Sequence, residues 1–226
     1  TISLLTTTAG DIVVARDVVT NAGAIGLVSA EDIALANDIT TGSAVNGALV
    51  DLIALNSRIT RTAGTVTSGR VLLAATGGIG AATAGNRVQT SSTDLQIGGA
   101  SVQLQGGAVA AVINGGDDFV ESVHALGVNV AGVNASGNID VTQVGANLTV
   151  NQIAAGAFDF APAAGDSAAS ITSAAQDGIT AQGGGRTIAL STRTSGDVVV
   201  TRAITSNGGD IGVVSSGNIA LANDVT

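Results

Sequence analysis

The sequence predicts an all-β protein folded as a right-handed parallel β-helix, a solenoid with about 20 residues in each coil and three short strands per coil. Three observations lead to this fold class. The chain repeats a long block, a shorter period lies inside that block, and its apolar residues are almost all aliphatic.

The long repeat is the clearest feature of the chain. The segments Thr1–Thr40 and Thr187–Thr226 align without a gap, so the repeat offset is 186, and 23 of the 40 positions are identical. The differences are mostly mild, such as Ile12 against Val198. We therefore expect one full period of a tandem array followed by the start of the next, and a chain that repeats a large block usually builds length.

A shorter period lies inside the long one. Residues Asp11–Thr20 match Asp32–Thr41 at an offset of 21, and Ile33–Leu35 recurs as Ile53–Leu55 at an offset of 20. Strands this short are unstable alone, but they become stable when each coil lies on the previous one and equivalent strands pair in parallel. The short period predicts about nine coils in each long block.

Each short unit contains three strand-like segments separated by corner residues. In the first unit these segments are Ile12–Val14, Val18–Thr20 and Ile25–Val28. Asn and Gly lie between them, and both residue types accept the positive φ that a sharp corner needs.

The composition suits a narrow interior and excludes several classes of protein. Hydrophobic residues make up 45% of the chain and aromatic residues 1%, and Cys, Met, Trp and Tyr are absent. No apolar run approaches the ~18 residues of a spanning helix, so we expect no membrane insertion. The net charge of −9 argues against nucleic acid as a partner. Without cysteine there is no disulfide and no thiolate metal site.

The pattern divides the chain into three parts. We expect coils over residues 1–153, an excursion over 154–177 that forms a loop or short helix, and coils over 178–226 that begin the next copy of the 186-residue repeat. The excursion contains the only proline, Pro162, and two of the three phenylalanines, Phe158 and Phe160, which we expect to cover a joint. Residues 115–119 suggest a smaller excursion.

The corner motifs resemble a known family. A Gly-Asp/Asn-Ile-x-Leu/Val strand opening falls on Gly10-Asp11-Ile12, Glu31-Asp32-Ile33, Gly196-Asp197-Val198 and Gly217-Asn218-Ile219. These coils are similar to the haemagglutinin-type repeats of the filamentous-haemagglutinin-like group of large secreted bacterial adhesins and exoproteins. The resemblance covers roughly residues 1–75 and 179–226. It implies a right-handed β-helix that is exported and displayed outside the cell as a fibre.

The sequence offers little for catalysis or metal binding. Asp11, Asp32 and Asp51 could align near one corner, as an enzyme acting on polysaccharides or a calcium site would require. No Tyr or Trp is present to stack a sugar ring, however, and the aspartate-rich motif of calcium-binding β-rolls is absent. His124 is the only histidine and is expected on an outer strand surface. We therefore assign no catalytic, cofactor-binding or metal-ligating residue.

These observations predict a non-catalytic structural protein, the shaft of an extracellular bacterial surface fibre built from tandem β-helix repeats. Its expected partners are identical repeats, through self-association or end-to-end continuation, and a host or matrix ligand is a further candidate. One alternative is an adhesive module that binds a host carbohydrate or receptor through the 154–177 excursion. A second is a β-helix enzyme acting on acidic polysaccharide, in which Asp32 or Asp51 would be required.

Overall fold

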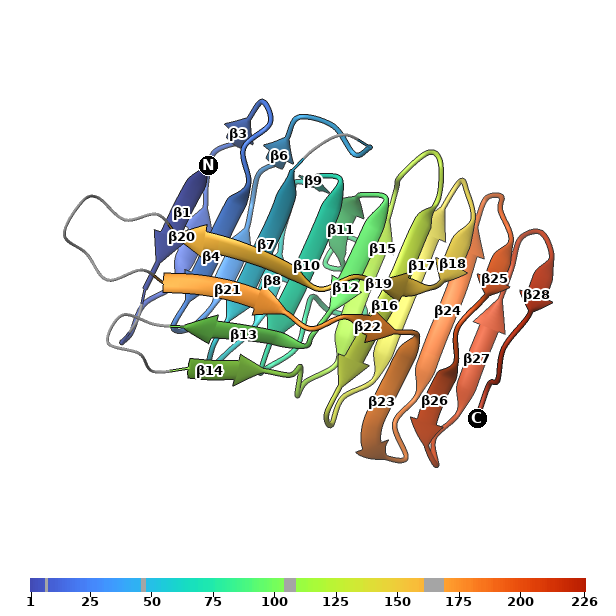
Figure 1. Ribbon diagram of the computed structural model, residues 1–226. Helices are drawn as coiled ribbons and strands as arrows, with labels where there is room; N and C mark the ends of the chain where they lie inside the picture. Colours follow the sequence, from blue (N-terminus) through green and yellow to red (C-terminus); the bar gives the residue numbers. More distant parts are fainter. Residues whose placement is uncertain (7, 46–47, 104–108, 161–168) are drawn as a thin grey trace.

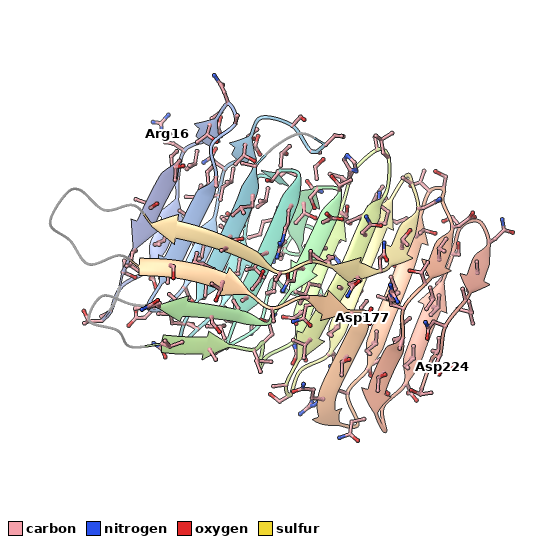
Figure 2. All side chains as sticks on the ribbon, viewed as in Figure 1. Arg16, Asp177 and Asp224 are labelled. Atoms are coloured by element: carbon pink, nitrogen blue, oxygen red, sulfur yellow. The ribbon has the colours of Figure 1, made fainter. Side chains whose placement is uncertain are left out.

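The computed structural model describes residues 1–6, 8–45, 48–103, 109–160 and 169–226, and every regular element in these ranges is a β-strand. The strands stack in parallel as a β-solenoid of about eight turns with roughly 24 residues per turn, which confirms the predicted fold class. Figure 1 shows the coils following one another along the axis from the N-terminus to the C-terminus. Arg16 marks the first coil and Asp224 the last (Figure 2). In these ranges no helix is long and apolar enough to cross a membrane.

Three parallel sheets form the sides of the solenoid. Face 1 has eleven strands: β1 (Ile2–Leu5), β4 (Ile25–Ser29), β7 (Leu49–Ala54), β10 (Arg70–Ala75), β12 (Asp94–Ile97), β16 (Val128–Asn134), β18 (Leu148–Val150), β23 (Ile179–Gly184), β25 (Val198–Val200), β26 (Ile204–Asn207) and β28 (Ile219–Leu221). Face 2 has eight strands: β3 (Val18–Thr20), β6 (Ile39–Thr41), β9 (Val66–Thr67), β11 (Val88–Ser91), β15 (Asp118–Ser122), β17 (Ile139–Val144), β24 (Ile188–Arg193) and β27 (Ile211–Val214). Face 3 has three strands: β2 (Ile12–Val14), β5 (Ile33–Leu35) and β8 (Ile59–Arg61).

The register between strands shows how far the chain advances in each coil. On face 1, Ile25 pairs with Val50, and Val50 pairs with Val71. Where the chain leaves the coil the spacing is about twice as large, and Val150 pairs with Val200. The whole chain makes about eight turns, fewer than the nine that we expected for each block, because the excursions take residues out of the coils.

The interior is built from columns of aliphatic side chains that follow the register. Ile25, Val50, Val71, Leu95 and Val130 form one such column, and each is fully buried. Every coil places an aliphatic side chain directly above the equivalent one in the coil before. A narrow interior of constant width is filled in this way without large rings.

Two excursions leave the coils and pair with each other in a four-stranded antiparallel sheet, which we call the overlay sheet. Its strands are β13 (Ala100–Gln103), β14 (Val109–Val112), β20 (Gly156–Phe160) and β21 (Ala169–Ser173), in the order β14-β13-β21-β20. A short antiparallel pair, β19 (Gln152–Ile153) with β22 (Gln176–Asp177), joins the second excursion to the coils. Figure 1 shows the overlay strands running across the strands of face 1.

The overlay sheet corrects the expectation of a loop or short helix over residues 154–177. The described residues of this segment form strands instead, because β21 buries Ile171 against face 1 and pairs its backbone with β13. Pro162 and the side chains of Phe158 and Phe160 lie outside the part of the molecule that the structure describes.

A second apolar layer joins the overlay sheet to the solenoid. The outward side chains of face 1 supply Val28, Ile53 and Leu72, and the overlay sheet supplies Val102 and Ile171. All five are buried, at 1% exposure or less. Both sides of face 1 are covered here. The sequences of its strands are therefore largely continuous apolar runs and do not alternate between apolar and polar residues.

The prediction of a smaller excursion at residues 115–119 is also wrong. Asp118 and Phe119 open strand β15, and Asp118 is bridged to Ile79 of the preceding coil. The excursion lies just before this point, in β13 and β14.

The sides of the solenoid change along its length. In the first coils face 1 is one long side, and faces 3 and 2 are two short sides that follow it. Single bridges join Ile59 of face 3 to Ile79, and Ile79 to Asp118 of β15. Beyond this point β15 and the later strands of face 2 therefore also continue the stack of strands that began as face 3. Face 1 divides in the same region, since the first half of β16 pairs with β18 and its second half with β23.

The two copies of the repeated segment therefore lie on opposite sides of the solenoid. The long strand β1 lies in face 1, but its sequence equivalent β24 spans the side formed by faces 3 and 2. Conversely, the short strands β2 and β3 lie in faces 3 and 2, whereas their equivalents β25 and β26 both lie in face 1. The 186-residue block is thus not a whole number of turns, and its second copy begins half a turn further around.

Local contacts are nevertheless the same in the two copies. The Ser29 hydroxyl donates to the Gly10 carbonyl at 2.9 Å, and the equivalent Ser215 hydroxyl donates to Gly196 at 3.0 Å. Gly10 and Gly196 have φ of 108° and 107°, a conformation that only glycine adopts without strain. The sequence thus specifies the corners and strands of a coil but not the side on which each strand lies.

Replacing Ile171 by alanine tests the second apolar layer. We expect a loss of about 2–4 kcal/mol in the free energy with which the overlay sheet docks, since a fully buried side chain is removed. Hydrogen exchange should accelerate in β13 and β21 while β5 and β8 stay protected. Val13→Ala, at a position that is 62% exposed, is the control. Equal protection of β13 and β21 in both variants would contradict docking through this layer.

Candidate functional site

Corner carboxylates link each coil to the next. Asp11 Oδ1 accepts the backbone amide of Asp32 at 3.0 Å, and Asp32 Oδ1 accepts the amide of Arg58 at 2.9 Å. In the second copy, Asp197 Oδ1 accepts the amide of Asn218 at 2.7 Å. The predicted alignment of Asp11 with Asp32 is thus confirmed. These carboxylates satisfy backbone donors at the corners, where the sheet hydrogen bonding is interrupted.

Asp51 does not belong to this series of corner carboxylates, which we call the corner ladder. It lies in β7 on face 1, paired with Gly26 and Leu72, and is only 5% exposed beneath the overlay sheet. Arg70 lies close enough to interact with its charge. The prediction that Asp51 aligns with Asp11 and Asp32 is therefore wrong, because its position falls within a strand rather than at a corner.

Arg70 connects the solenoid to the overlay sheet. Its guanidinium donates to Gln96 Oε1 at 2.6 Å and to the hydroxyl of Ser173 in β21. Gln96 in turn donates through Nε2 to the carbonyl of Ala174 at 3.2 Å. This polar cluster, Asp51, Arg70, Gln96 and Ser173, holds the overlay sheet in a fixed position on face 1.

Burial raises the pKa of Asp51 from 3.8 to about 7, and the positive charge of Arg70 opposes that rise. A carboxyl group with this pKa changes its charge near neutral pH. It lies under the overlay sheet, however, and not in a surface hollow.

A second buried carboxylate lies where the first excursion returns to the coil. Asp118 Oδ1 accepts Asn114 Nδ2 at 2.9 Å, and Asp118 Oδ2 accepts Asn134 Nδ2 at 2.7 Å. Asn114 Oδ1 accepts the backbone amide of Ala75 at 2.9 Å, and Asn134 Oδ1 accepts the amide of Ser136 at 3.0 Å. This network joins three successive coils.

Burial also raises the pKa of Asp118 to about 7, while the amide donors of Asn134 and Asn114 lower it. These donors are fixed by their own bonds to the backbone, so they stabilise the charged carboxylate. Asp118, Asn114 and Asn134 are all buried, and their hydrogen bonds link the coils at this joint.

His124 is buried at 4% exposure, which corrects its expected place on an outer surface. Its Nδ1 lies 2.7 Å from the carbonyl oxygen of Gly127, across the turn that leads into β16. The side chain closes this turn, a role that no short sequence motif indicates.

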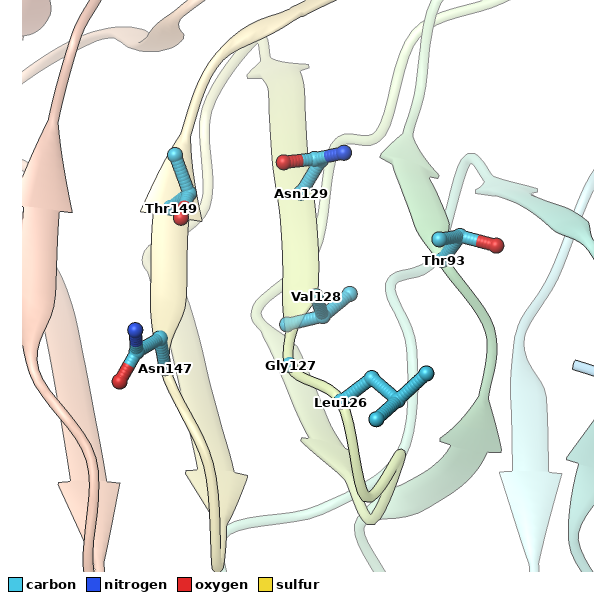
Figure 3. A pocket seen from close by; sticks show the side chains of 7 residues that line it. All are labelled: Thr93, Leu126, Gly127, Val128, Asn129, Asn147 and Thr149. Carbon is cyan, nitrogen blue, oxygen red and sulfur yellow. The ribbon is translucent and has the colours of Figure 1, made fainter. Parts of the chain in front are cut away.

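The outer surface has shallow hollows without carboxylates. One is lined by uncharged residues of three neighbouring coils, and Figure 3 shows Asn129, Asn147 and Thr149 around it with Leu126 at its rim. A second follows the edge of the overlay sheet and includes Gln176. A third contains two arginines, Arg58 and Arg61, beside Thr60 and Asn86. None of the residues lining these three hollows is acidic.

Within the described ranges, no group of three or more His, Cys, Asp or Glu side chains is placed to hold a metal ion. The Oδ1 atoms of Asp11 and Asp32 accept backbone amides, as described above. The two aspartates that the enzyme hypothesis named are separated, since Asp32 lies at the corner before face 3 and Asp51 within face 1.

Comparison with known proteins finds no matching family model, no matching curated protein and no matching solved structure. The chain is therefore assigned to a fold, the β-solenoid, and to no family.

The pH dependence of stability tests the buried carboxyl group of Asp51. Its pKa is higher in the folded protein than in the unfolded chain, so its contribution is most favourable below about pH 4 and is lost as the pH rises through 7. Asp51→Asn should raise the free energy of unfolding at pH 8 by about 1–3 kcal/mol and change it little at pH 4. Denaturant unfolding at both pH values measures this difference. Val13→Ala, which alters no titratable group and lies at a position that is 62% exposed, is the control, and an unchanged profile for Asp51→Asn would disprove the assignment.

The corner ladder is tested at Asp32. We expect Asp32→Ala to lower the free energy of unfolding by about 1 kcal/mol, because the amide of Arg58 loses its acceptor. Asp32→Asn keeps an oxygen at this position and should retain most of the stability. Thermal unfolding of both variants makes the comparison, and equal losses would show that the carboxylate charge matters rather than the hydrogen bond.

Proposed function

We propose that this chain is a section of the shaft of an extracellular bacterial surface fibre, and that it acts without catalysis. The observation that carries the proposal is that one set of coil contacts occurs twice, as in Gly10 with Ser29 and Gly196 with Ser215. A coil that is specified twice by the same residues can be extended by further copies. The likeness of the corner motifs to haemagglutinin-type repeats supports placement outside the cell.

We propose that the partners of these coils are identical repeats, either in the same chain or from a second copy. Ile33 and Leu35 are buried under the next coil at 0% and 3% exposure. The second copy has the same residue types at the equivalent positions, Ile219 and Leu221. Coils of both copies can therefore stack on a neighbour through the same side chains.

Rotation of the repeat by half a turn gives the fibre a specific arrangement. If every long block begins half a turn further around the solenoid, the overlay sheet of the next block covers the opposite side. Successive overlay sheets then point in alternating directions along the fibre, and the arrangement repeats after two blocks.

A designed chain that appends a second copy of residues 41–226 after Thr226 tests this arrangement. Electron microscopy should show one unbroken rod with two overlay sheets, rotated by roughly 180° about its axis. Two overlay sheets in line, or two separate bodies, would contradict the proposal.

A second candidate function is adhesion through the overlay sheet. The observation that favours it is that two excursions far apart in the sequence form one ordered sheet on the outside of the solenoid, which a plain shaft does not need. Ser101 and Thr172 are paired neighbours on this sheet. Ser101 is not buried, so it is available for contact with another molecule.

Arginine at Ser101 distinguishes the two functions. If the sheet is adhesive, Ser101→Arg should reduce attachment of fibre-bearing cells to host cells or matrix at least tenfold without changing fibre length. If the chain is a shaft only, attachment and length both stay at the level of the unmodified fibre. Val13→Arg, on the outside of face 3, is the matched control.

A further inference from the structure

The hollow beside β8 contains the two arginines Arg58 and Arg61, at the two ends of a single short strand segment. Its other wall is the loop that follows Ile79. Arg58 Nη2 donates to the carbonyl of Gly80 at 2.9 Å, and Arg61 Nη1 donates to the carbonyl of Gly85 at 2.8 Å. The two side chains therefore hold the loop and line the hollow at the same time.

Neither guanidinium has a carboxylate partner among the described residues. The ion pairs in the described part of the chain join Arg87 to Asp140, Arg193 to Glu121, and Arg202 to Asp177. The hydrogen bonds of Arg58 and Arg61 go to neutral carbonyl and amide oxygens. In a chain of net charge −9, these two guanidinium groups form no ion pair in the described ranges, although the Asp32 carboxylate accepts the backbone amide of Arg58.

Arg87 shows how the same region neutralises an arginine with a structural role. It donates to both carboxylate oxygens of Asp140, at 2.7 and 3.0 Å, and lies 5.8 Å from the centre of the Phe119 ring. An aspartate could neutralise Arg58 in the same way, but none of the residues lining the hollow is acidic.

The donors around the hollow are suited to an oxyanion. Of the five N–H donors of Arg58, one is used by Gly80. Thr60, between the two arginines, adds a hydroxyl to the lining. Guanidinium groups match carboxylate, sulfate and phosphate in geometry and charge. The hollow measures about 430 Å³, which accommodates a single sugar-sized molecule.

We propose that this hollow, formed by Arg58, Thr60, Arg61 and the loop from Gly80 to Asn86, is a binding site for an oxyanion, either inorganic or carried on a hydroxylated molecule such as a sugar acid. No aromatic side chain lines it, so recognition depends on charge and hydrogen bonds rather than on ring stacking. The site is open to solvent, and its affinity for a single anionic group should be in the millimolar range.

Amide chemical shifts of the isotope-labelled protein test the site directly. Sulfate, phosphate and glucuronate are titrated at constant ionic strength, with glucose as the neutral control. We expect saturable shifts at Thr60, Arg61 and Gly80 with at least one of the three anions and none with glucose. Saturation by sulfate or phosphate alone identifies an inorganic oxyanion, and saturation by glucuronate identifies a carboxylate on a sugar ring.

Variants separate binding from a general effect of charge. Arg58→Ala should lower the affinity for the anion at least tenfold. Arg58→Lys keeps the charge but loses the planar donor pair, and it should lower the affinity less. Arg16, an exposed arginine near the N-terminal end, is the control, and Arg16→Ala should leave the affinity unchanged (Figure 2). If Arg58→Ala disturbs the loop, Arg58→Lys alone decides the outcome. Linear, unsaturated shifts for all three anions, or equal affinity in all variants, would overturn the proposal.

Discussion

Parallel backbone pairing between each coil and the next is the interaction on which the rest of the structure depends. It fixes the register, and the register places each buried side chain above an equivalent one, as in the column of Ile25, Val50 and Val71. Strands as short as β5 persist because they are paired on both sides. Corner residues such as Asp32 satisfy the amides that the sheets leave open, so the pairing continues around each turn.

The overlay sheet follows from the same constraint. Beneath the overlay sheet, the outward side of face 1 carries Val28, Ile53 and Leu72, which water would otherwise contact. The two excursions cover these residues and pair with each other, and the cluster around Arg70 fixes their position. A solenoid that continues without interruption inside can in this way carry a separate layer outside.

Charge is distributed unevenly over this framework. Asp51 and Asp118 are buried at joints, where neighbouring donors or a cation partly offset the cost of removing a carboxylate from water. Arg58 and Arg61, by contrast, lie at the surface without an acidic partner among the described residues.

The sequence by itself determined the fold class, the strands and corners of each coil, and the ladder from Asp11 to Asp32, because these depend on local periodicity and on equivalent residues one coil apart. Only the tertiary structure decided that residues 154–177 form strands, that Asp51 is buried, and that the second copy of the repeat begins half a turn further around. These outcomes depend on pairing between segments such as β13 and β21, which lie far apart in the chain. The local sequence does not indicate such a partner, because the residue pattern of a short strand is the same whichever segment covers it.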